Sequence, residues 1–431
     1  MNKIIKMWDV IWKKGLLHIF AGTFMTKVIS FFGSIFLVRV LSKQEYGILG
    51  YLDNIYGYAF VFAGMGLSNA ILRYVVLAET IQEKYNYFNY AVKKGIVWNV
   101  ILILCLLIFS GFYPHPAAYQ NYIWLLCILI IAVPFQYIID NVLCNERAMF
   151  SNQRYALYSF CFSGVTIISK ILFGKWFGIK GVVFSQVCIY IVLAVSFFIL
   201  TKKDYYSDLI SKKLSKSEKS TITRYSLQYM ITNGLWAIFM LNDTFLLGRY
   251  CAPEIIAEYK VAYTIPGSVS LLSTAIGIFV TPYFVRNENN NAWIRSNYKK
   301  TYLITAGVVG AICLIITVLA KPIVLLLYGS EYINVVKIMG VLLIASFFNC
   351  GLRYTTANIL AAMGKVKYNM IISGIGILLQ FSLNIQIIPR FGAMGVAITS
   401  CIVYGIMAIS LLFIFLKQYY WDNNPGNKNC K

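Results

Sequence analysis

Apolar residues recur along this chain in stretches of about 20 residues, separated by short polar segments. A helix of that length crosses the hydrocarbon core of a membrane, about 30 Å thick, with its backbone hydrogen bonds satisfied internally. The pattern predicts twelve membrane spans, at about 17–38, 48–74, 95–113, 122–144, 155–174, 181–201, 225–248, 261–284, 301–320, 335–361, 368–388 and 394–416. We therefore predict an all-α polytopic membrane protein.

One segment occurs twice. "FGIKGVVFSQVCIY" at 177–190 returns as "FGAMGVAITSCIVY" at 391–404, which aligns Gly178 with Gly392 and Gly181 with Gly395. Two further pairs are similar, "SGVTIISK" at 163–170 with "SGIGILLQ" at 373–380, and "FLVRVLSKQEYG" at 36–47 with "FLLGRYCAPEIIAEY" at 245–259. Six crossings return a chain to the side it started from, so the two repeats are parallel. We expect about 12 transmembrane helices, arranged as two parallel six-helix repeats around a central cavity.

The longest polar stretch, 202–224, divides these halves and predicts a basic cytoplasmic linker. The predicted parts are an N-terminal half at 1–201, this linker, a C-terminal half at 225–416 and a cytoplasmic tail at 417–431. Within the spans, "YTIPGSVS" at 263–270 contains Pro266 and is where we most expect a hinge or a broken helix.

Composition and charge strengthen the membrane assignment. Apolar residues make up 59% of the chain and charged residues 13%, and the formal net charge is +22. Lysine and arginine accumulate in short cytoplasmic loops, and most of the 38 lie inside if both termini are cytoplasmic. The positive charge therefore indicates topology and contact with anionic membrane lipids rather than nucleic acid.

Polar residues within the spans follow helical spacing, so each set shares one face of its helix. The sets are Thr23, Lys27, Ser30 and Ser34; Ser159, Ser163, Thr166 and Lys170; Tyr229, Asn233, Trp236, Met240 and Asp243; and Asn349, Arg353 and Thr356. An unpaired charge at the bilayer centre costs about 3 kcal/mol, so these faces should meet protein or a wet cavity. The candidate substrate-binding residues are Lys27, Lys170, Arg353, Asn349 and Asn233, and the candidate ion-coupling residues are Asp53, Asp140 and Asp243.

Structural pairing is an equal alternative for these charges, because the three cations balance the three carboxylates. For Asp243, helix capping or pairing with Arg249 is a further alternative. The chain has only two histidines, His18 and His115, which excludes an H-E-x-x-H zinc motif, and it has no G-x-x-x-x-G-K-[ST] phosphate loop. The sequence predicts no cofactor and no enzyme.

Three stretches carry a family resemblance: "RVLSKQEYG" at 39–47, "GMGLSNAILRY" at 64–74 and "NDTFLLGRYCAPEIIAEYKVAY" at 242–263. Through them the chain resembles Wzx-type polysaccharide or O-antigen flippases of the multidrug/oligosaccharidyl-lipid/polysaccharide exporter superfamily. The resemblance covers the whole chain in span number and repeat, but these motifs mark the fold more than the cargo.

The resemblance implies a flippase in the bacterial inner membrane. Its substrate would be an undecaprenyl-pyrophosphate-linked oligosaccharide, moved from the inner to the outer leaflet by alternating access. The implied partners are that lipid, membrane lipids, H⁺ or Na⁺ as a coupling ion, and polysaccharide assembly proteins. A cation-coupled multidrug exporter of the same superfamily is the alternative, which a cavity of net negative charge would favour, and a membrane enzyme such as a polymerase is a distant third.

Overall fold

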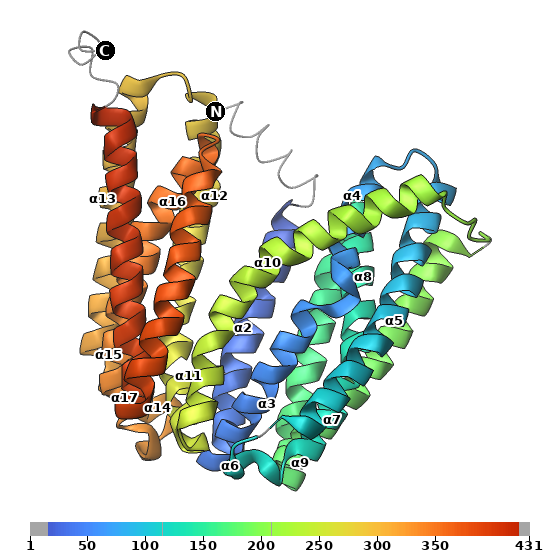
Figure 1. Cartoon of the computed structure of the whole chain (residues 1–431), viewed down its shortest axis with the longest axis horizontal. Coiled ribbons are helices and arrows are strands. Elements are labelled where there is room, and N and C mark those ends of the chain that lie inside the picture. Colours follow the sequence, from blue (N-terminus) through green and yellow to red (C-terminus); the bar gives the residue numbers. More distant parts are fainter. Residues whose placement is uncertain (1–15, 114, 208, 422–431) are drawn as a thin grey trace. The chain divides into compact units, whose positions relative to one another are not determined.

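The computed structural model describes residues 16–113, 115–207 and 209–421, which form helices and no strands (Figure 1). The chain divides into two compact units, Met1–Phe245 and Leu246–Lys431. Among the described residues, eight helices, or nine with the bent pair α3–α4, are long and apolar enough to cross a membrane. The chain is therefore a multi-pass membrane protein.

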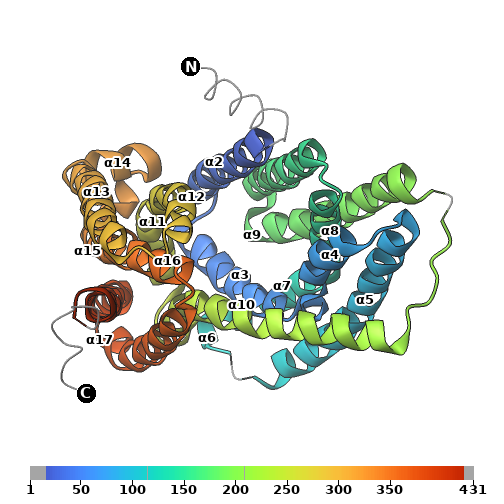
Figure 2. The same ribbon diagram turned by 90° about the horizontal axis from the view of Figure 1, so that it is seen from above.

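The first unit begins with helices that match the first predicted spans. Its elements are α2 (Leu16–Val40), α3 (Lys43–Val61), the 3₁₀ turn η1 (Ala63–Gly66), α4 (Leu67–Leu77), α5 (Ile81–Phe112), α6 (Ala117–Gln120), α7 (Ile123–Ile130), α8 (Val133–Ala148), α9 (Asn152–Tyr206) and most of α10 (Lys216–Tyr250). α3 and α5 start at capping boxes, in which Ser42 and Thr80 exchange hydrogen bonds with Glu45 and Glu83. Both views show α2 beside α9 (Figures 1 and 2), where Gly33 lies close to Ile167.

α9 is a helical hairpin. Its 55 residues would extend about 80 Å as one straight helix, far more than one crossing needs. Gly178 has φ 59° and ψ −146°, a conformation that favours glycine, and reverses the chain there. The two arms then pack together, with ring centroids 4.4 Å apart for Tyr158 and Phe197. α9 therefore contains two of the predicted spans.

The second unit ends in a matching hairpin. Its elements are α11 (Pro253–Ser268), α12 (Ser270–Arg286), α13 (Asn291–Val318), α14 (Ala320–Tyr328), η2 (Ser330–Tyr332), α15 (Val335–Ser346), the π-helical segment η3 (Phe347–Arg353), α16 (Tyr354–Ala362), α17 (Val366–Leu416) and η4 (Lys417–Trp421). In α17, Gly392 has φ 53° and ψ −131°, and Gln380 Nε2 on one arm donates to Ser400 Oγ on the other at 3.3 Å.

The repeated segment therefore encodes the same turn twice. After each turn a second glycine, Gly181 or Gly395, lets the arms approach closely. A Cβ atom there would lie 2.1 Å from Phe173 O in the first unit and 3.1 Å from Ile387 O in the second. The internal repeat thus has a physical reason at its best-matched residues.

The structure places the broken span elsewhere than we predicted. Between α11 and α12, Val269 keeps helical angles of φ −59° and ψ −26°, so Pro266 does not break the span. The bent pair lies instead in the second predicted span, between α3 and α4. Residues 64–66 have left-handed backbone conformations, which end a right-handed helix. A proline removes only one backbone hydrogen bond, so a helix can continue through it with a kink.

The predicted linker is largely helical. α9 continues to Tyr206, α10 begins at Lys216, and α10 belongs to the first unit as far as Phe245. The predicted halves at 1–201 and 225–416 stay predictions. Of the predicted tail, residues 417–421 continue as η4, and 422–431 lie outside the described residues.

Candidate functional site

The second predicted span is broken where its sequence reads "FAGMG". α3 and α4 meet at an angle of 46°, and Gly64, Met65 and Gly66 have φ values of 55°, 54° and 73°. Such a break exposes backbone groups, which must find partners at membrane depth. α5 supplies them: Gly64 N–H donates to Asn99 Oδ1 at 2.7 Å, and Trp98 Nε1 donates to Phe62 O at 2.8 Å. The break is therefore held in place by specific hydrogen bonds.

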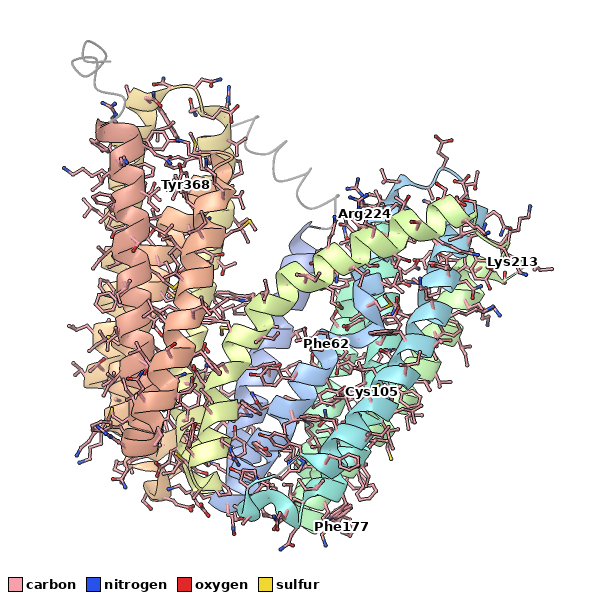
Figure 3. The ribbon with its side chains drawn as sticks, in the orientation of Figure 1. Phe62, Cys105, Phe177, Lys213, Arg224 and Tyr368 are labelled. Carbon is pink, nitrogen blue, oxygen red and sulfur yellow. The ribbon has the colours of Figure 1, made fainter. Side chains whose placement is uncertain are left out.

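A cavity of about 420 Å³ lies beside this break. Its walls come from α3, η1, α4, α8 and α10: Gly57, Phe60, Val61, Ala63, Gly66, Ser68, Asn69, Tyr137, Asp140, Tyr229, Met230, Asn233, Gly234, Ala237, Met240 and Leu241. Figure 3 shows Phe62 between the end of the unit that carries Lys213 and Arg224 and the opposite end, where Phe177 precedes the α9 turn. The cavity thus lies part-way along the unit.

Asp140 supplies the carboxylate of this cavity. The side chain is half-buried on α8, and within the described residues it has neither an ion-pair nor a hydrogen-bond partner. Tyr56 lies close enough to interact with it electrostatically, and the Tyr56 hydroxyl donates to Gln136 Oε1 at 2.6 Å. A carboxylate beside a broken span is suited to binding a proton or a small cation.

α10 brings a second predicted residue to the same cavity. Tyr229, Asn233 and Met240 of the polar stripe on the seventh predicted span all contribute to the lining. Asn233 Nδ2 donates to Tyr229 O at 3.0 Å, which ties the amide to the preceding helical turn. The structure therefore places Asn233 and Asp140, two of the eight predicted site residues, around one cavity.

The two other predicted carboxylates of the first unit do not line this cavity. Asp53 on α3 is half-buried and interacts electrostatically with Tyr56 and Tyr190, as Asp140 also does. Asp243 on α10 is buried and interacts with Tyr58. Asp53 therefore lies in the surroundings of Asp140, and Asp243 lies near Tyr58 without lining the cavity.

The two predicted lysines of the first unit form no ion pair with a described carboxylate. Lys27 on α2 is exposed and Lys170 on α9 is half-buried, and within the described ranges neither lies at ion-pair distance from a carboxylate. Lys27 and Asp53 accordingly do not form the structural ion pair that was the alternative to a binding role. The side chain of Thr23, on the same predicted face as Lys27, lies outside the described residues.

Arg353 and Asn349 form a separate cluster in the second unit. Both lie on η3, where Arg353 Nε donates to Asn349 Oδ1 at 2.8 Å. The guanidinium carbon lies 6.0 Å from the centre of the Tyr404 ring, and Arg353 is only 8% exposed. Short π-helical segments are frequent at functional sites. Arg353 and Asn349, which were predicted to share a helix face, are thus hydrogen-bonded to each other on the π-helical segment η3.

Sequence reasoning missed several cavity residues. Ser68 and Asn69 lie in the first turn of α4, directly after the break. Tyr137 packs against Gly64, and its hydroxyl donates to Ala91 O at 2.8 Å. Their signal was the "GMG" within an apolar span, which marks left-handed backbone at a depth where helices are normally continuous.

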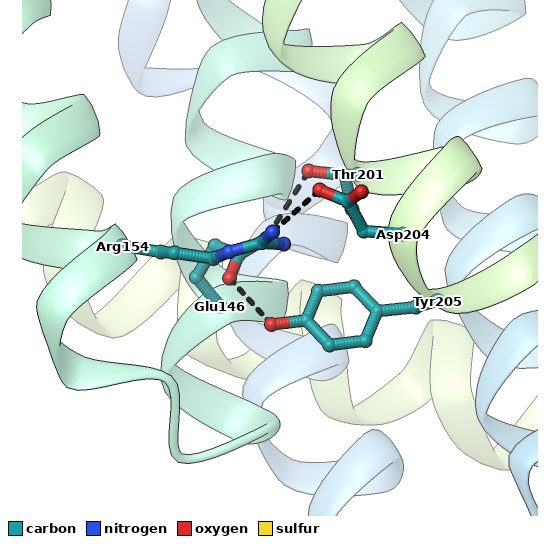
Figure 4. Close-up of polar contacts among 5 residues, drawn as sticks. All are labelled: Glu146, Arg154, Thr201, Asp204 and Tyr205. Atoms are coloured by element: carbon teal, nitrogen blue, oxygen red, sulfur yellow. Dashed lines mark hydrogen bonds and ion pairs between the residues drawn. The ribbon is translucent and has the colours of Figure 1, made fainter.

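A second missed cluster holds α8 against both ends of α9 (Figure 4). Glu146 is fully buried and accepts hydrogen bonds from Thr201 Oγ1 at 3.1 Å and from the Tyr205 hydroxyl at 2.9 Å. Beside it, Arg154 and Asp204 form an ion pair with a separation of 2.6 Å. These contacts fix the hairpin ends rather than the cavity.

Comparison with known sequences gives one family. The family model described as "Polysaccharide biosynthesis protein" matches residues 36–337. An uncharacterized membrane protein of Methanocaldococcus jannaschii is 22% identical over 423 residues, which cover 89% of this chain and 80% of the relative. A probable flippase of Haloferax volcanii, AglR, is 23% identical over 376 residues, which cover 85% of this chain and 75% of the relative.

Solved structures share the fold. The inward closed conformation of the lipid II flippase MurJ has a TM-score of 0.72 and 17% identity, over 92% of this chain and 87% of that one. An inward-facing multidrug resistance transporter of the MATE family, MOP superfamily, has a TM-score of 0.71 and 16% identity, over 91% and 94%. At these identities the likeness shows the fold alone.

Proposed function

Since the chain belongs to the family of polysaccharide biosynthesis proteins, we propose that it is a flippase for an undecaprenyl-pyrophosphate-linked oligosaccharide. It moves this lipid from the inner to the outer leaflet by alternating access, in a bacterial inner membrane with both termini cytoplasmic. The probable flippase AglR and the lipid II flippase MurJ support a lipid-linked substrate. Polysaccharide assembly proteins are its further proposed partners.

The observation that carries this proposal is the pair of uncompensated lysines. Lys27 and Lys170 lie on spans and have no carboxylate at ion-pair distance within the described residues. Such charges are expensive in a membrane unless they meet water or an anionic ligand. A pyrophosphate headgroup supplies that negative charge, while its lipid tail stays in the bilayer.

Asp140 provides the proposed coupling group. It faces the cavity without a partner in the described part of the chain, so a proton or Na⁺ can bind there and neutralise it. Asp53 and Asp243 are proposed as further members of the coupling system, and Arg353, Asn349 and Asn233 as further substrate contacts.

A multidrug exporter is the second candidate, and Asp140 is the observation that favours it. Exporters of this kind use carboxylates to couple cation entry to the exit of a cationic, apolar drug. The described cavity contains Asp140 and no lysine or arginine, which suits such a cargo. The two candidates therefore differ in whether Lys27 and Lys170 contact the transported molecule.

The experiment expresses the chain in a bacterial host that lacks its own flippase, and measures surface glycan together with protein level. Wild type should restore glycan, and the double variant Lys27→Met/Lys170→Met should lower it by about tenfold or more at unchanged protein level, because two charge-assisted contacts are lost. Lys175→Met, at an exposed lysine of α9, is the matched control. Drug resistance without glycan would identify the exporter instead.

A further inference from the structure

The first turns of α10 contact a cation on each of two neighbouring helices. Lys94 on α5 is half-buried, and its ammonium group donates to Thr223 Oγ1 at 2.8 Å and to the Tyr90 hydroxyl at 3.1 Å. Arg73 on α4 is exposed, and its guanidinium carbon lies 5.3 Å from the centre of the Tyr225 ring. Thr223 and Tyr225 are two residues apart, which is about 200° around a helix, so the two cations contact different sides of α10.

Neither cation has a counter-charge. Within the described residues, no carboxylate lies at ion-pair distance from Lys94 or Arg73. Two glutamates of the same region cap the starts of helices. Glu218 accepts a hydrogen bond from the Ser215 N–H at 2.7 Å, and Glu83 caps α5. Hydroxyl partners do not neutralise an ammonium group, and a half-buried charge without compensation is unfavourable. An anionic ligand would offset it.

Lys94 lies close to the residues that form the break beside the cavity. Lys94 lies one helical turn before Trp98, whose indole N–H donates a hydrogen bond to Phe62 O at the break. On α10, Ser226 follows Thr223 by one turn, and a Cβ atom on Gly66 would lie 2.6 Å from Ser226 O. α5 starts at the end of the unit that carries Lys213 and Arg224 (Figure 3), so Lys94 lies between that basic end and the cavity.

We propose that Lys94 binds a phosphate of a polyprenyl-pyrophosphate lipid between the basic end of the unit and this cavity. An ammonium group attracts phosphate as a point charge. The Tyr90 and Thr223 hydroxyls now accept from Lys94, and both can also donate to phosphate oxygens. This inference rests on the proposed function and assigns its headgroup a specific contact in the first unit.

The test uses the full-length protein in phosphatidylcholine nanodiscs, titrated with undecaprenyl pyrophosphate and followed by native mass spectrometry. Lys94→Met should weaken binding by about 10- to 100-fold, the range for a lost hydrogen bond to a charged group. Lys93→Met is the matched control, because Lys93 is the exposed neighbour of Lys94 on α5. The affinity of Lys93→Met for undecaprenyl pyrophosphate should stay within about twofold of wild type, since adjacent side chains on a helix point about 100° apart.

A second variant separates ligand binding from helix docking. Thr223→Val removes the contact between Lys94 and α10 but keeps the cation, so binding should stay within about threefold of wild type. An equal loss in Thr223→Val and Lys94→Met would overturn the proposal, because Lys94 would then only hold α10 in place. Thermal unfolding of each variant confirms that it is folded.

A control lipid and the surface-glycan assay distinguish failure of this inference from failure of the proposed function. Phosphatidylglycerol should bind wild type at least about tenfold more weakly than undecaprenyl pyrophosphate, which carries more phosphate charge at its headgroup. Equal affinity would contradict a substrate site and indicate a general anionic-lipid site. If wild type restores surface glycan but Lys94→Met binds like Lys93→Met, this inference fails and the proposed function stands. If wild type neither restores glycan nor binds the probe, both fail.

Discussion

At the scale of single residues, charged side chains in this protein fall into two groups. Glu146 is fully buried, but its carboxylate accepts two hydroxyl hydrogen bonds and lies beside the Arg154–Asp204 ion pair (Figure 4). Asp140, in contrast, has neither a hydrogen-bond nor an ion-pair partner within the described residues. Satisfied charges support the fold, and unsatisfied charges are the ones that can act on a ligand.

Glu146→Gln tests the structural group. The amide keeps the shape of the side chain but offers one acceptor oxygen in place of two, so the Thr201 or Tyr205 hydroxyl loses its partner. We expect a loss of about 1–3 kcal/mol in stability, which is typical for a buried group left unpaired. The measurement is the thermal unfolding midpoint in detergent, compared with Glu288→Gln at an exposed site. Equal midpoints for the two variants would refute this role.

At the scale of elements, the glycine turns decide the architecture. Gly178 in α9 and Gly392 in α17 turn each long helix into a hairpin. Glu45 of the "RVLSKQEYG" stretch supports the first turn, since its Oε1 accepts the Ile179 N–H at 3.2 Å while Oε2 caps α3. That stretch therefore joins the start of α3 to the α9 turn, which explains why it marks the fold rather than the cargo.

Gly178→Ala should destabilise the first unit. An alanine at φ 59° and ψ −146° is strained, and its Cβ would lie 2.4 Å from Glu45 Oε1, displacing the carboxylate from Ile179. We expect at least about 2 kcal/mol of lost stability. Gly307→Ala is the control, because a Cβ there meets open space and alanine favours helix, so it should be neutral or slightly stabilising. A Gly178 variant that melts like the control would show that the turn tolerates a side chain.

Cys251, between α10 and α11, tests the predicted topology. In a variant whose only cysteine is Cys251, an impermeant maleimide should label sealed cells, because this segment is predicted to lie outside. Burial raises the pKa of the Cys251 thiol, so the reactive thiolate is scarce at pH 7 and labelling should accelerate as the pH rises towards 9. Labelling of a Cys430-only variant in sealed cells, with none at Cys251, would reverse the orientation.

The sequence predicted the helices well and the site in part. Apolar length located the spans, and both hairpin turns lie in the short gaps left between predicted spans, at 175–180 and 389–393, because span length is a local property of the chain. The break at Gly64–Gly66 was missed, since left-handed backbone in a span depends on side chains from α5 such as Asn99. Helical spacing grouped Tyr229 with Asn233, but could not show that α8 brings Asp140 to them.

At the scale of the whole molecule, the first unit contains the features on which the proposed coupled transport rests. It has a cavity with an unpaired carboxylate among the described residues, a broken span beside it, and uncompensated cations on α2, α5 and α9. In the proposed function the cations attract an anionic headgroup and Asp140 binds the driving ion, so the two proposed roles belong to different residues. Substitutions at Asp140 and at the lysines should therefore have separable effects.

The most direct test reconstitutes the purified protein in proteoliposomes and measures transbilayer movement of a fluorescent lipid-linked oligosaccharide under an imposed H⁺ or Na⁺ gradient. Wild type should move the lipid faster with one of these gradients than without, and Asp140→Asn should lose that acceleration while still binding the lipid, because the amide cannot bind the driving ion by charge. Gradient-driven export of a cationic dye, with no movement of the glycolipid, would contradict the account.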